Sequence, residues 1–278
     1  MARSENKETA GTTTRYVARI ARILRKQKGL SQEELGKEIG FTGSAVSAME
    51  TGAQPASDQM LEALERVLGD GLGLFDEARE FVRLDKYPRQ FKDFAPLEQR
   101  AVALFVYETH LINGLLQTAE YATALIASSF PPPTDGKVEE LVEARMARKA
   151  LFSRRPTALV EMIVDESALR REIGSRDIMR SQLSHLVETG RLRNVTLQVL
   201  PLAAGLRGEY AGDRGSLTLV ETPEDDRWAY LEPQDESLLI KDATKVRTYA
   251  QRYAKIRAQA LGPDESLALI ERLAGEDR

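Results

Sequence analysis

The sequence predicts two joined domains: an all-α N-terminal domain of about five helices that contains a helix-turn-helix, and a mixed α+β C-terminal domain with about four strands. Three observations predict this fold class. In the first third of the chain, apolar residues recur at helical spacing between capping residues. Segments rich in branched and aromatic residues begin only at Thr157. Between these regions, Asp85-Lys86-Tyr87-Pro88 interrupts the helical pattern.

These patterns divide the chain into four parts. Residues 1–13 are polar and basic and are expected to form a flexible arm. Residues 14–84 are expected to form the helix-turn-helix domain, residues 85–96 a linker, and residues 97–278 a C-terminal domain for sensing or partner binding and for assembly. A length of 278 residues, of which 42% are hydrophobic, is sufficient for two domains of ordinary size.

The N-terminal domain is expected to contain helices over Thr14–Lys28, Ser31–Glu38, Thr42–Glu50, Ser57–Leu68 and Leu72–Leu84. An apolar stripe at the spacing i, i+3, i+4, i+7 gives the first helix its buried side: Val17, Ile20, Ala21 and Leu24. Gly29 ends this helix. The basic residues of the same helix are left largely on its other faces.

The second and third helices form a closed unit around a tight turn. Ser31 and Glu34 make a capping box at the start of the second helix, and Gly40 with Phe41 breaks the pattern. Thr42 caps the third helix, and Gly52 supplies the left-handed residue that ends it. Four short side chains then face outward: Ser44, Ser47, Ala48 and Thr51. This arrangement is what a helix-turn-helix requires.

The same segment resembles the phage-repressor type of helix-turn-helix, also called Xre. The matching residues, at the family's spacing, are Gly29, Leu30, Ser31, Gln32, Leu35, Ile39, Gly40, Val46, Ser47, Glu50 and Gly52. A helical bundle that shares the pattern by chance is the alternative, but no generic bundle requires these caps, glycines and polar residues in this order. The resemblance implies DNA binding and an interhelical ion pair between Arg25 and Glu50.

The residues expected to contact DNA are Arg15, Gln32, Thr42, Gly43, Ser44, Ser47, Ala48 and Thr51. Gln32 begins the second helix and is expected to meet a phosphate together with the amides of that N-terminus. The outward side chains of the third helix are short, and the loop after Gly52 lacks basic residues. We therefore expect limited reading of bases, moderate affinity, and compensation by a homodimer.

Charge is distributed unevenly along the chain. The formal net charge is −4, but the first thirty residues hold eight basic and two acidic residues and so carry +6, which leaves −10 for the remainder. The basic residues are Arg3, Lys7, Arg15, Arg19, Arg22, Arg25, Lys26 and Lys28. A basic arm and first helix suit phosphate contact, whereas an acidic remainder tends to confine DNA to one face. A solvated tail is the alternative for Arg3 and Lys7.

Cysteine is absent, which excludes disulfides, thiolate metal sites and a cysteine nucleophile. The longest apolar runs contain few residues, and the first residues of the chain are polar. We therefore expect neither a membrane span nor a secretory signal, and a soluble protein of the cytoplasm.

The C-terminal domain is expected to begin with helices over Leu97–His110, Thr118–Ser128 and Lys137–Phe152, with a turn at Asn113-Gly114. Four strands follow, over Thr157–Val164, Asn194–Leu200, Ser216–Glu221 and Trp228–Glu232. Further helices are expected over Glu166–Glu172, Arg176–Thr189, Thr244–Ala260 and Asp264–Ala274.

This region, over about Leu97 to Ile270, resembles the C-terminal domain of a group of actinobacterial regulators that includes WhiJ-like and antitoxin-like proteins. The motifs that carry the resemblance are GLLQTAEYA from Gly114, DESALR from Asp165, Gln182-Leu183, and NVTLQVLP from Asn194. Asn113 departs from the family, which usually has proline there. The resemblance implies a sensor or partner-binding domain, without a general ligand.

The residues singled out as a partner or ligand region are Gln117, Tyr121, Arg145, Arg148, Trp228 and Glu232. Structural roles compete with this interpretation. Thr118 and Glu120 favour a helix start, and the two arginines favour a solvated or salt-bridged helix face. Trp228, the only tryptophan, is expected to be a core anchor or, as the alternative, an interface residue.

Catalysis is not expected. The two histidines, His110 and His185, lie in segments expected to be helical and lack neighbours at metal-ligand spacing. Gly205, Gly208, Gly212 and Gly215 fall between two expected strands without the lysine or helix of a phosphate loop. No nucleophile elbow occurs. We therefore expect neither a metal nor another cofactor.

The sequence as a whole predicts a sequence-specific DNA-binding transcriptional regulator that forms a homodimer and receives a signal through its C-terminal domain. The alternative is an antitoxin-like interaction protein, which binds a small partner protein and uses the helix-turn-helix to regulate its own gene.

Overall fold

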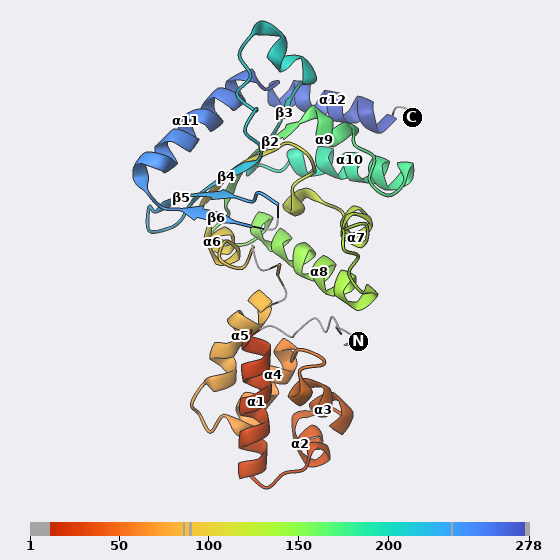
Figure 1. Cartoon of the computed structure of the whole chain (residues 1–278), viewed down its shortest axis with the longest axis vertical. Helices are drawn as coiled ribbons and strands as arrows, with labels where there is room; N and C mark the ends of the chain where they lie inside the picture. Colours follow the sequence, from red (N-terminus) through yellow and green to blue (C-terminus); the bar gives the residue numbers. More distant parts are fainter. Residues whose placement is uncertain (1–11, 86, 89–90, 235, 276–278) are drawn as a thin grey trace, which may run out of the picture. The chain divides into compact units, whose positions relative to one another are not determined.

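The computed structural model describes residues 12–85, 87–88, 91–234 and 236–275. Most of the basic arm expected over residues 1–13, with Arg3 and Lys7, therefore lies outside the described residues. The chain divides into two compact units, Met1–Arg89 and Gln90–Arg278 (Figure 1). The division falls within the segment expected to be a linker, and each unit is described by itself.

The N-terminal unit is entirely helical among its described residues. Its helices are α1 (Thr12–Gln27), α2 (Gln32–Ile39), α3 (Gly43–Thr51), α4 (Asp58–Leu68) and α5 (Leu74–Asp85). Each boundary lies within two residues of the expected one, because most of these ends carry local caps. The all-α fold class of this unit is confirmed.

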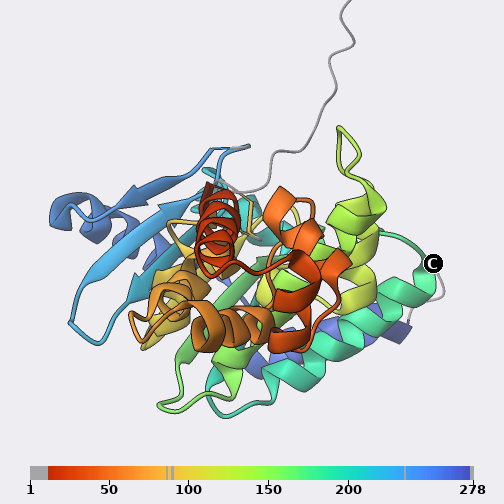
Figure 2. The same ribbon diagram turned by 90° about the horizontal axis from the view of Figure 1, so that it is seen from below.

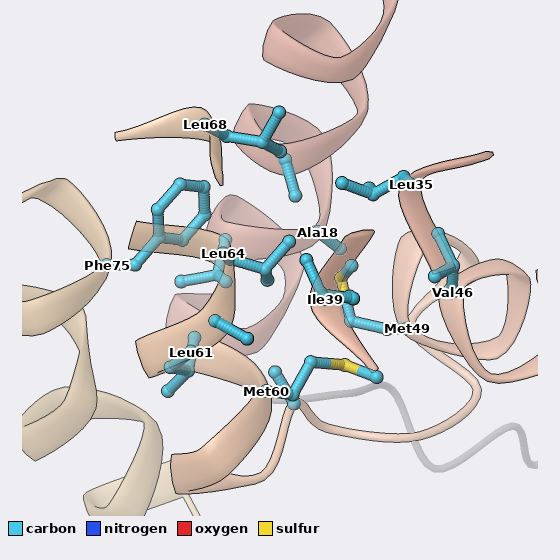
Figure 3. Packing of buried hydrophobic residues seen from close by; sticks show 14 of the residues in the cluster. Ala18, Leu35, Ile39, Val46, Met49, Met60, Leu61, Leu64, Leu68 and Phe75 are labelled. Carbon is cyan, nitrogen blue, oxygen red and sulfur yellow. The ribbon is translucent and has the colours of Figure 1, made fainter. Parts of the chain in front are cut away.

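One hydrophobic core joins the five helices of the N-terminal unit (Figure 3). Leu35 and Ile39 of α2 and Val46 and Met49 of α3 enter it from one side, and Leu64 lies fully buried at its centre. α2 and α3 are too short to be stable alone, so their packing on this core holds the helix-turn-helix in place. Shortening a side chain such as Leu64 to alanine would cost about 2–5 kcal/mol.

The C-terminal unit mixes helices and strands, as expected. Its α-helices are α6 (Ala95–Arg100), α7 (Ala119–Ala127), α8 (Asp135–Ala147), α9 (Glu166–Arg170), α10 (Arg176–Gly190), α11 (Ala243–Gln259) and α12 (Pro263–Gly275). Short 3-10 helices are η2 (Gly114–Leu116), η3 (Arg148–Phe152) and η4 (Leu202–Arg207). The strands are β1 (Ala103–Glu108), β2 (Leu159–Asp165), β3 (Val195–Leu200), β4 (Leu217–Glu221), β5 (Arg227–Leu231) and β6 (Leu238–Ile240).

These strands form one six-stranded sheet in the order β3-β2-β1-β4-β5-β6. β1, β2 and β3 are parallel, and their connections carry helices, as parallel pairing requires. β4 pairs antiparallel with β1, and β5 and β6 continue the sheet as hairpin-like neighbours. β1 is therefore the strand at which the sheet changes from parallel to antiparallel pairing.

The expectation of about four strands was too low, and the expected helix over Leu97–His110 was wrong in its second half. α6 ends at Arg100, and Ala103–Glu108 forms β1. No glycine or proline separates the two elements, so the apolar pattern looked continuous. Pairing with both β2 and β4 makes this segment a strand. The strand β6 was also missed, because it is only three residues long.

Helices cover both faces of the sheet (Figures 1 and 2). α11 packs on one face, where Val246, Tyr253 and Ile256 meet Tyr107 and Ile163. Because side chains alternate along a strand, the neighbouring buried residues of β1 and β2 face the other side, where α7, α8 and α10 lie. None of the helices in the described part of the chain is long and apolar enough to cross a bilayer.

Candidate DNA-binding site and C-terminal polar cluster

The caps of the helix-turn-helix form as the sequence indicates. The Ser31 hydroxyl accepts a hydrogen bond from the Glu34 amide, and the Glu34 carboxylate accepts one from the Ser31 amide. Thr42 accepts a hydrogen bond from the Ala45 amide at the start of α3. Gly40 and Gly52 end α2 and α3 with φ angles of 78° and 73°. These local bonds define where each helix of the motif begins and ends.

Two glycines, which carried no structural weight in the sequence analysis, set the distance between α2 and α3. A Cβ atom on Gly36 would lie 2.8 Å from the Phe41 carbonyl oxygen and 3.0 Å from the Gly43 amide nitrogen. A Cβ on Gly43 would lie 2.9 Å from Cγ of Glu33. Gly43, a residue expected to contact DNA, thus also lets the starts of α2 and α3 approach one another. A glycine inside an otherwise helical pattern was the available signal for Gly36.

The outward face of α3 is accessible and carries only short side chains. Ser44 and Thr51 are exposed, and Ser47 and Ala48 are half-buried. The Thr51 hydroxyl donates to the carbonyl oxygens of Ser47 and Ala48, and the hydroxyls of Thr42 and Ser44 are hydrogen-bonded to each other. Recognition by this face would therefore depend on small polar groups and a close approach of the helix backbone.

A charged network lies beneath this face. The Glu50 carboxylate accepts hydrogen bonds from Nε of Arg25 at 2.6 Å, from Nη2 of Arg25 at 2.9 Å, and from Nε2 of Gln32 at 2.8 Å. Burial opposes ionisation of Glu50, but the hydrogen bonds from Arg25 and Gln32 outweigh it, so the pKa of Glu50 lies below its ordinary value. The ion pair implied by the resemblance is thus present.

Gln32 and Arg15, which are both expected to contact DNA, differ in their surroundings. Gln32 is anchored to Glu50, which leaves its second N–H and its carbonyl oxygen for other contacts. Arg15 is exposed on α1, in line with the exposed Arg19, Arg22 and Lys26. These four side chains form a basic stripe along α1, and Arg22 lies near enough to Glu50 to lower its pKa.

The GLLQT segment of the C-terminal unit is held by two buried glutamines. Gln182 of α10 accepts from the Thr118 amide at 2.7 Å and donates to the Leu116 carbonyl at 2.8 Å. Gln117 donates to the Ile112 carbonyl at 2.7 Å. The Thr118 hydroxyl caps α7. These residues of the motif therefore have structural roles in this loop.

The DESALR segment is likewise a strand-to-helix junction. Asp165 ends β2 and caps α9 by accepting from the Ser167 amide. Glu166 binds Arg170 one turn further on and accepts from the Leu202 amide after β3. The segment ties the ends of two parallel strands together, which explains its sequence without a ligand.

Each of the two units matches the model of a protein family. Residues 22–70, from α1 to just beyond α4, match a helix-turn-helix family, which indicates a DNA-binding regulator. Residues 91–272, about two thirds of the chain, match a domain of unknown function, DUF5753. The chain belongs to the DUF5753 family. The family's description names no activity, and the WhiJ-like and antitoxin-like grouping expected from the sequence stays a prediction.

No curated protein matches the chain, and no solved structure does.

In the DUF5753 domain, Arg148 belongs to a buried polar cluster. Its Nε and Nη2 each lie 2.7 Å from a carboxylate oxygen of Glu98, and its guanidinium lies 4.2 Å from the centroid of the Phe91 ring. A Cβ on Gly114 would lie 2.7 Å from Nη1 of Arg148, so the loop passes close to this guanidinium. Arg148 is thus salt-bridged in the interior and is not on a solvated helix face.

Arg145 and Gln117 also meet, through a hydrogen bond of 2.7 Å from Nη1 to Oε1. Burial is the main cause that lowers the pKa of Arg145 to about 10, and the charge of Arg148 adds to it. Tyr121 is fully buried, and its hydroxyl lies against the backbone amide of Ile112. The structure therefore brings together Gln117, Arg145 and Arg148, with Tyr121 electrostatically coupled to Arg145.

Trp228 and Glu232 are placed differently. Trp228 of β5 is half-buried, and the Lys241 ammonium lies 4.9 Å from the centroid of its ring. It is therefore only partly buried, whereas a core anchor was favoured from the sequence and an interface residue was the alternative. Glu232 follows β5, is exposed, and accepts a hydrogen bond from Tyr230. Its charge nevertheless acts on Arg145 and raises the pKa of that residue.

Neither histidine belongs, among the residues that the structure describes, to a group that could hold a metal. His110 lies in the loop after β1, not in a helix as expected, and contacts the Thr109 hydroxyl. His185 lies on α10, where burial and Lys149 lower its pKa. Within the described ranges of the chain, no three histidine, aspartate or glutamate side chains are arranged as metal ligands.

Proposed function

We propose that this protein is a sequence-specific transcriptional regulator, whose two copies pair through the DUF5753 domain and respond to a signal received there. The observation that carries the proposal is the accessible face of α3, which is positioned by two capped helix starts and two close-packed glycines. The match to a helix-turn-helix family supports the same role.

The electrostatics of the N-terminal unit favour this function. The basic stripe on α1 (Arg15, Arg19, Arg22 and Lys26) is exposed, whereas the nearby Glu50 is neutralised by Arg25. Phosphates can therefore approach the stripe without meeting a free carboxylate at Glu50. The remaining acidic charge of the chain disfavours binding elsewhere.

The proposal is tested by selecting genomic fragments that the intact protein binds, and by measuring affinity for the selected site at several salt concentrations. We expect a linear fall of log K against log salt, with a slope of about −0.9 for each phosphate contact. Substitution of Arg15 by glutamine should make the slope shallower by about one contact. A flat salt dependence would contradict phosphate contact by this unit.

Dimerisation follows from the short side chains on α3, since one such helix discriminates weakly and two half-sites multiply the discrimination. We expect sedimentation to show a dimer of the intact chain and of the C-terminal unit, residues 90–278. A monomeric C-terminal fragment at micromolar concentration would move the dimer contacts to the N-terminal unit. Purification from the native host tests the antitoxin-like alternative, which requires a stoichiometric small protein.

A further inference from the structure

The outer surface of α1 and α5 in the N-terminal unit exposes four large apolar side chains. Tyr16 and Ile23 of α1 are 65% and 58% exposed, and Leu74 and Phe81 of α5 are 43% and 55% exposed. The two members of each pair are seven residues apart, so they share one helix face and lie about 10.5 Å apart along the axis. Single apolar residues are common on protein surfaces, but two such pairs in one small unit indicate a patch. We call these four residues the α1/α5 face.

The two pairs are level with each other, because α1 and α5 pack side by side in opposite directions (Figure 1). At one end, the Thr14 amide in the first turn of α1 donates to the Asp85 carboxylate in the last turn of α5 at 2.8 Å. At the other end, Nζ of Lys28, just after α1, lies 2.7 Å from the carboxylate of Asp70, just before α5. The apolar residues between these two contacts therefore form rows along adjacent helices.

The flanks of the two helices show that both pairs point to the same side. Ile20 and Ala78, each four residues after the first member of its pair, are partly buried and pack against the core. Arg25, on the flank of α1 opposite to Ile20, binds Glu50 of α3. Arg83, on the flank of α5 opposite to Ala78, binds α4. The flanks with Ile20 and Ala78 are thus the ones that adjoin each other, and the exposed pairs lie at their outer side.

Charges of opposite sign border the α1/α5 face. Arg19 and Lys26 are exposed beside it on α1, and Glu77 and Glu80 are exposed beside it on α5. Arg19 stands three residues after the first apolar residue of its helix and four before the second, and Glu77 has the same place in α5. Each of these two charges therefore neighbours both apolar residues of its helix. A basic edge, an apolar centre and an acidic edge follow one another across the two helices.

We propose that the α1/α5 face binds the same face of a second copy of this chain, with α1 of each copy over α5 of the other. A two-fold axis parallel to the helices produces this pairing and sets the basic edge of each copy against the acidic edge of the other. A two-fold axis across the helices would place α1 over α1, with like charges opposed. Charge complementarity thus favours a second copy as the occupant and fixes how it is oriented.

This contact supplements the pairing proposed for the DUF5753 domain, on which the inference rests. Four large side chains a copy are far fewer than the about 20–30 residues a side of a standard interface, so the contact is weak by itself. Two copies held together elsewhere meet at a high effective concentration, which makes a weak contact sufficient. The contact fixes the two copies of α3 relative to each other and so specifies the spacing of the half-sites. Arg15 and Arg22 lie outside the basic edge and stay open to phosphates.

The test uses cysteine crosslinking of the intact protein, because the chain contains no cysteine of its own. Chains with Ile23→Cys and chains with Leu74→Cys are co-expressed with different tags and treated with a short bis-maleimide without DNA. We expect a covalent dimer that carries both tags, since these two positions face each other in the proposed pairing. Ile23→Cys should crosslink little with itself. Glu38→Cys, at an exposed position on α2, is the matched control and should also crosslink little.

Reversal of the charges at the edges gives a second readout. Arg19→Glu should lower the yield of the mixed dimer about fivefold, because acidic edges then oppose each other. Arg19→Glu combined with Glu77→Arg should restore the yield, since the edges are complementary again. Both positions are exposed, so the melting temperature of each variant should stay close to that of the parent, which shows that the fold is kept.

Sedimentation of the same samples separates this contact from the pairing of the DUF5753 domains. A dimeric chain without the mixed crosslink, or one in which Ile23→Cys crosslinks mainly with itself, would overturn the proposed contact and leave that pairing intact. A monomeric chain would overturn both. Slow labelling of Ile23→Cys by a simple maleimide, without any dimer, would show that the face is covered within one chain and would also overturn the proposal. Mixed dimers that respond to charge reversal support it.

Discussion

Arg25 of α1 and Glu50 of α3 form a two-pronged hydrogen bond inside the N-terminal unit, with Nε to Oε1 at 2.6 Å and Nη2 to Oε2 at 2.9 Å. The third nitrogen of Arg25 donates to the Leu30 carbonyl at 2.6 Å. The two side chains are 9% and 1% exposed, so the pair is buried. It joins the first helix, the turn after it and the helix proposed to read DNA.

Replacing Glu50 by alanine should lower the free energy of unfolding of the N-terminal unit by about 3–5 kcal/mol, because it leaves the Arg25 guanidinium buried without its counter-charge. The matched control is Glu62→Ala, which removes an exposed carboxylate 3.2 Å from Arg79 and should cost under about 1 kcal/mol. Urea unfolding of residues 1–89 measures both variants. Equal costs would show that burial of the Arg25–Glu50 pair has no energetic consequence.

The same pair predicts a dependence on pH. Burial raises the pKa of Glu50, but the hydrogen bonds from Arg25 and Gln32 reverse this, so the folded-state pKa lies below the unfolded one. The stabilisation is therefore complete above the unfolded pKa of about 4.3 and is lost as the pH falls through the folded pKa. The stability difference between the parent and Glu50→Gln should be constant at neutral pH and shrink in acid. A difference that grows in acid would reverse the assigned sign.

Two helical glycines should respond in opposite directions to alanine. Gly36→Ala should destabilise the N-terminal unit, because its Cβ would lie 2.8 Å from a backbone carbonyl oxygen that cannot move without opening the turn. Gly136→Ala, in the first turn of α8, meets nothing within 4 Å and should stabilise its unit by under about 1 kcal/mol, since alanine is the better helix former. Thermal unfolding of the two variants decides the matter, and a stabilising Gly36→Ala would contradict the packing described.

Ala48→Glu should weaken specific DNA binding most among single changes on the outward face of α3, because it places a carboxylate against phosphates and base edges. Ser44→Ala and Ser47→Ala should weaken it less. Gln59→Glu, which adds the same charge to an exposed position on α4, is the control for net charge. Electrophoretic mobility shifts with the selected operator measure all four. Full affinity in a folded Ala48→Glu protein would exclude α3 as the reader.

Gln182 is expected to stabilise the fold of the C-terminal unit by holding the GLLQT loop. Gln182→Leu removes the partners of the Thr118 amide and the Leu116 carbonyl, and should cost about 2–6 kcal/mol, because each buried polar group left unpaired costs about 1–3 kcal/mol. Ser181→Ala, at the exposed neighbouring position, should change stability by under about 0.5 kcal/mol. Denaturant unfolding of the intact chain compares them, and near-equal values would place the stability of the GLLQT loop elsewhere.

The helix-turn-helix was predictable because its signals are local. Ser31, Glu34 and Thr42 are within three residues of the amides they satisfy, and Gly40 and Gly52 act through their own φ angles. The residues expected to contact DNA were chosen from this register, since a helix of known ends has a known outward face. The sheet was less predictable. β1 pairs Ala103 with Leu159 and with Glu221, and such distant partners leave no trace in the local pattern.

By itself the sequence determined the class of each domain, the motif of the N-terminal unit and the ends of its helices, because capping and periodicity act over a few residues. Tertiary structure alone decided which polar side chains of the DUF5753 domain are neutralised. Arg145 and Arg148 lie three residues apart and look alike in the sequence, yet Glu98 reaches only Arg148. Compensation of a buried charge depends on groups that folding brings from distant segments, so the difference between Arg145 and Arg148 appears only in three dimensions.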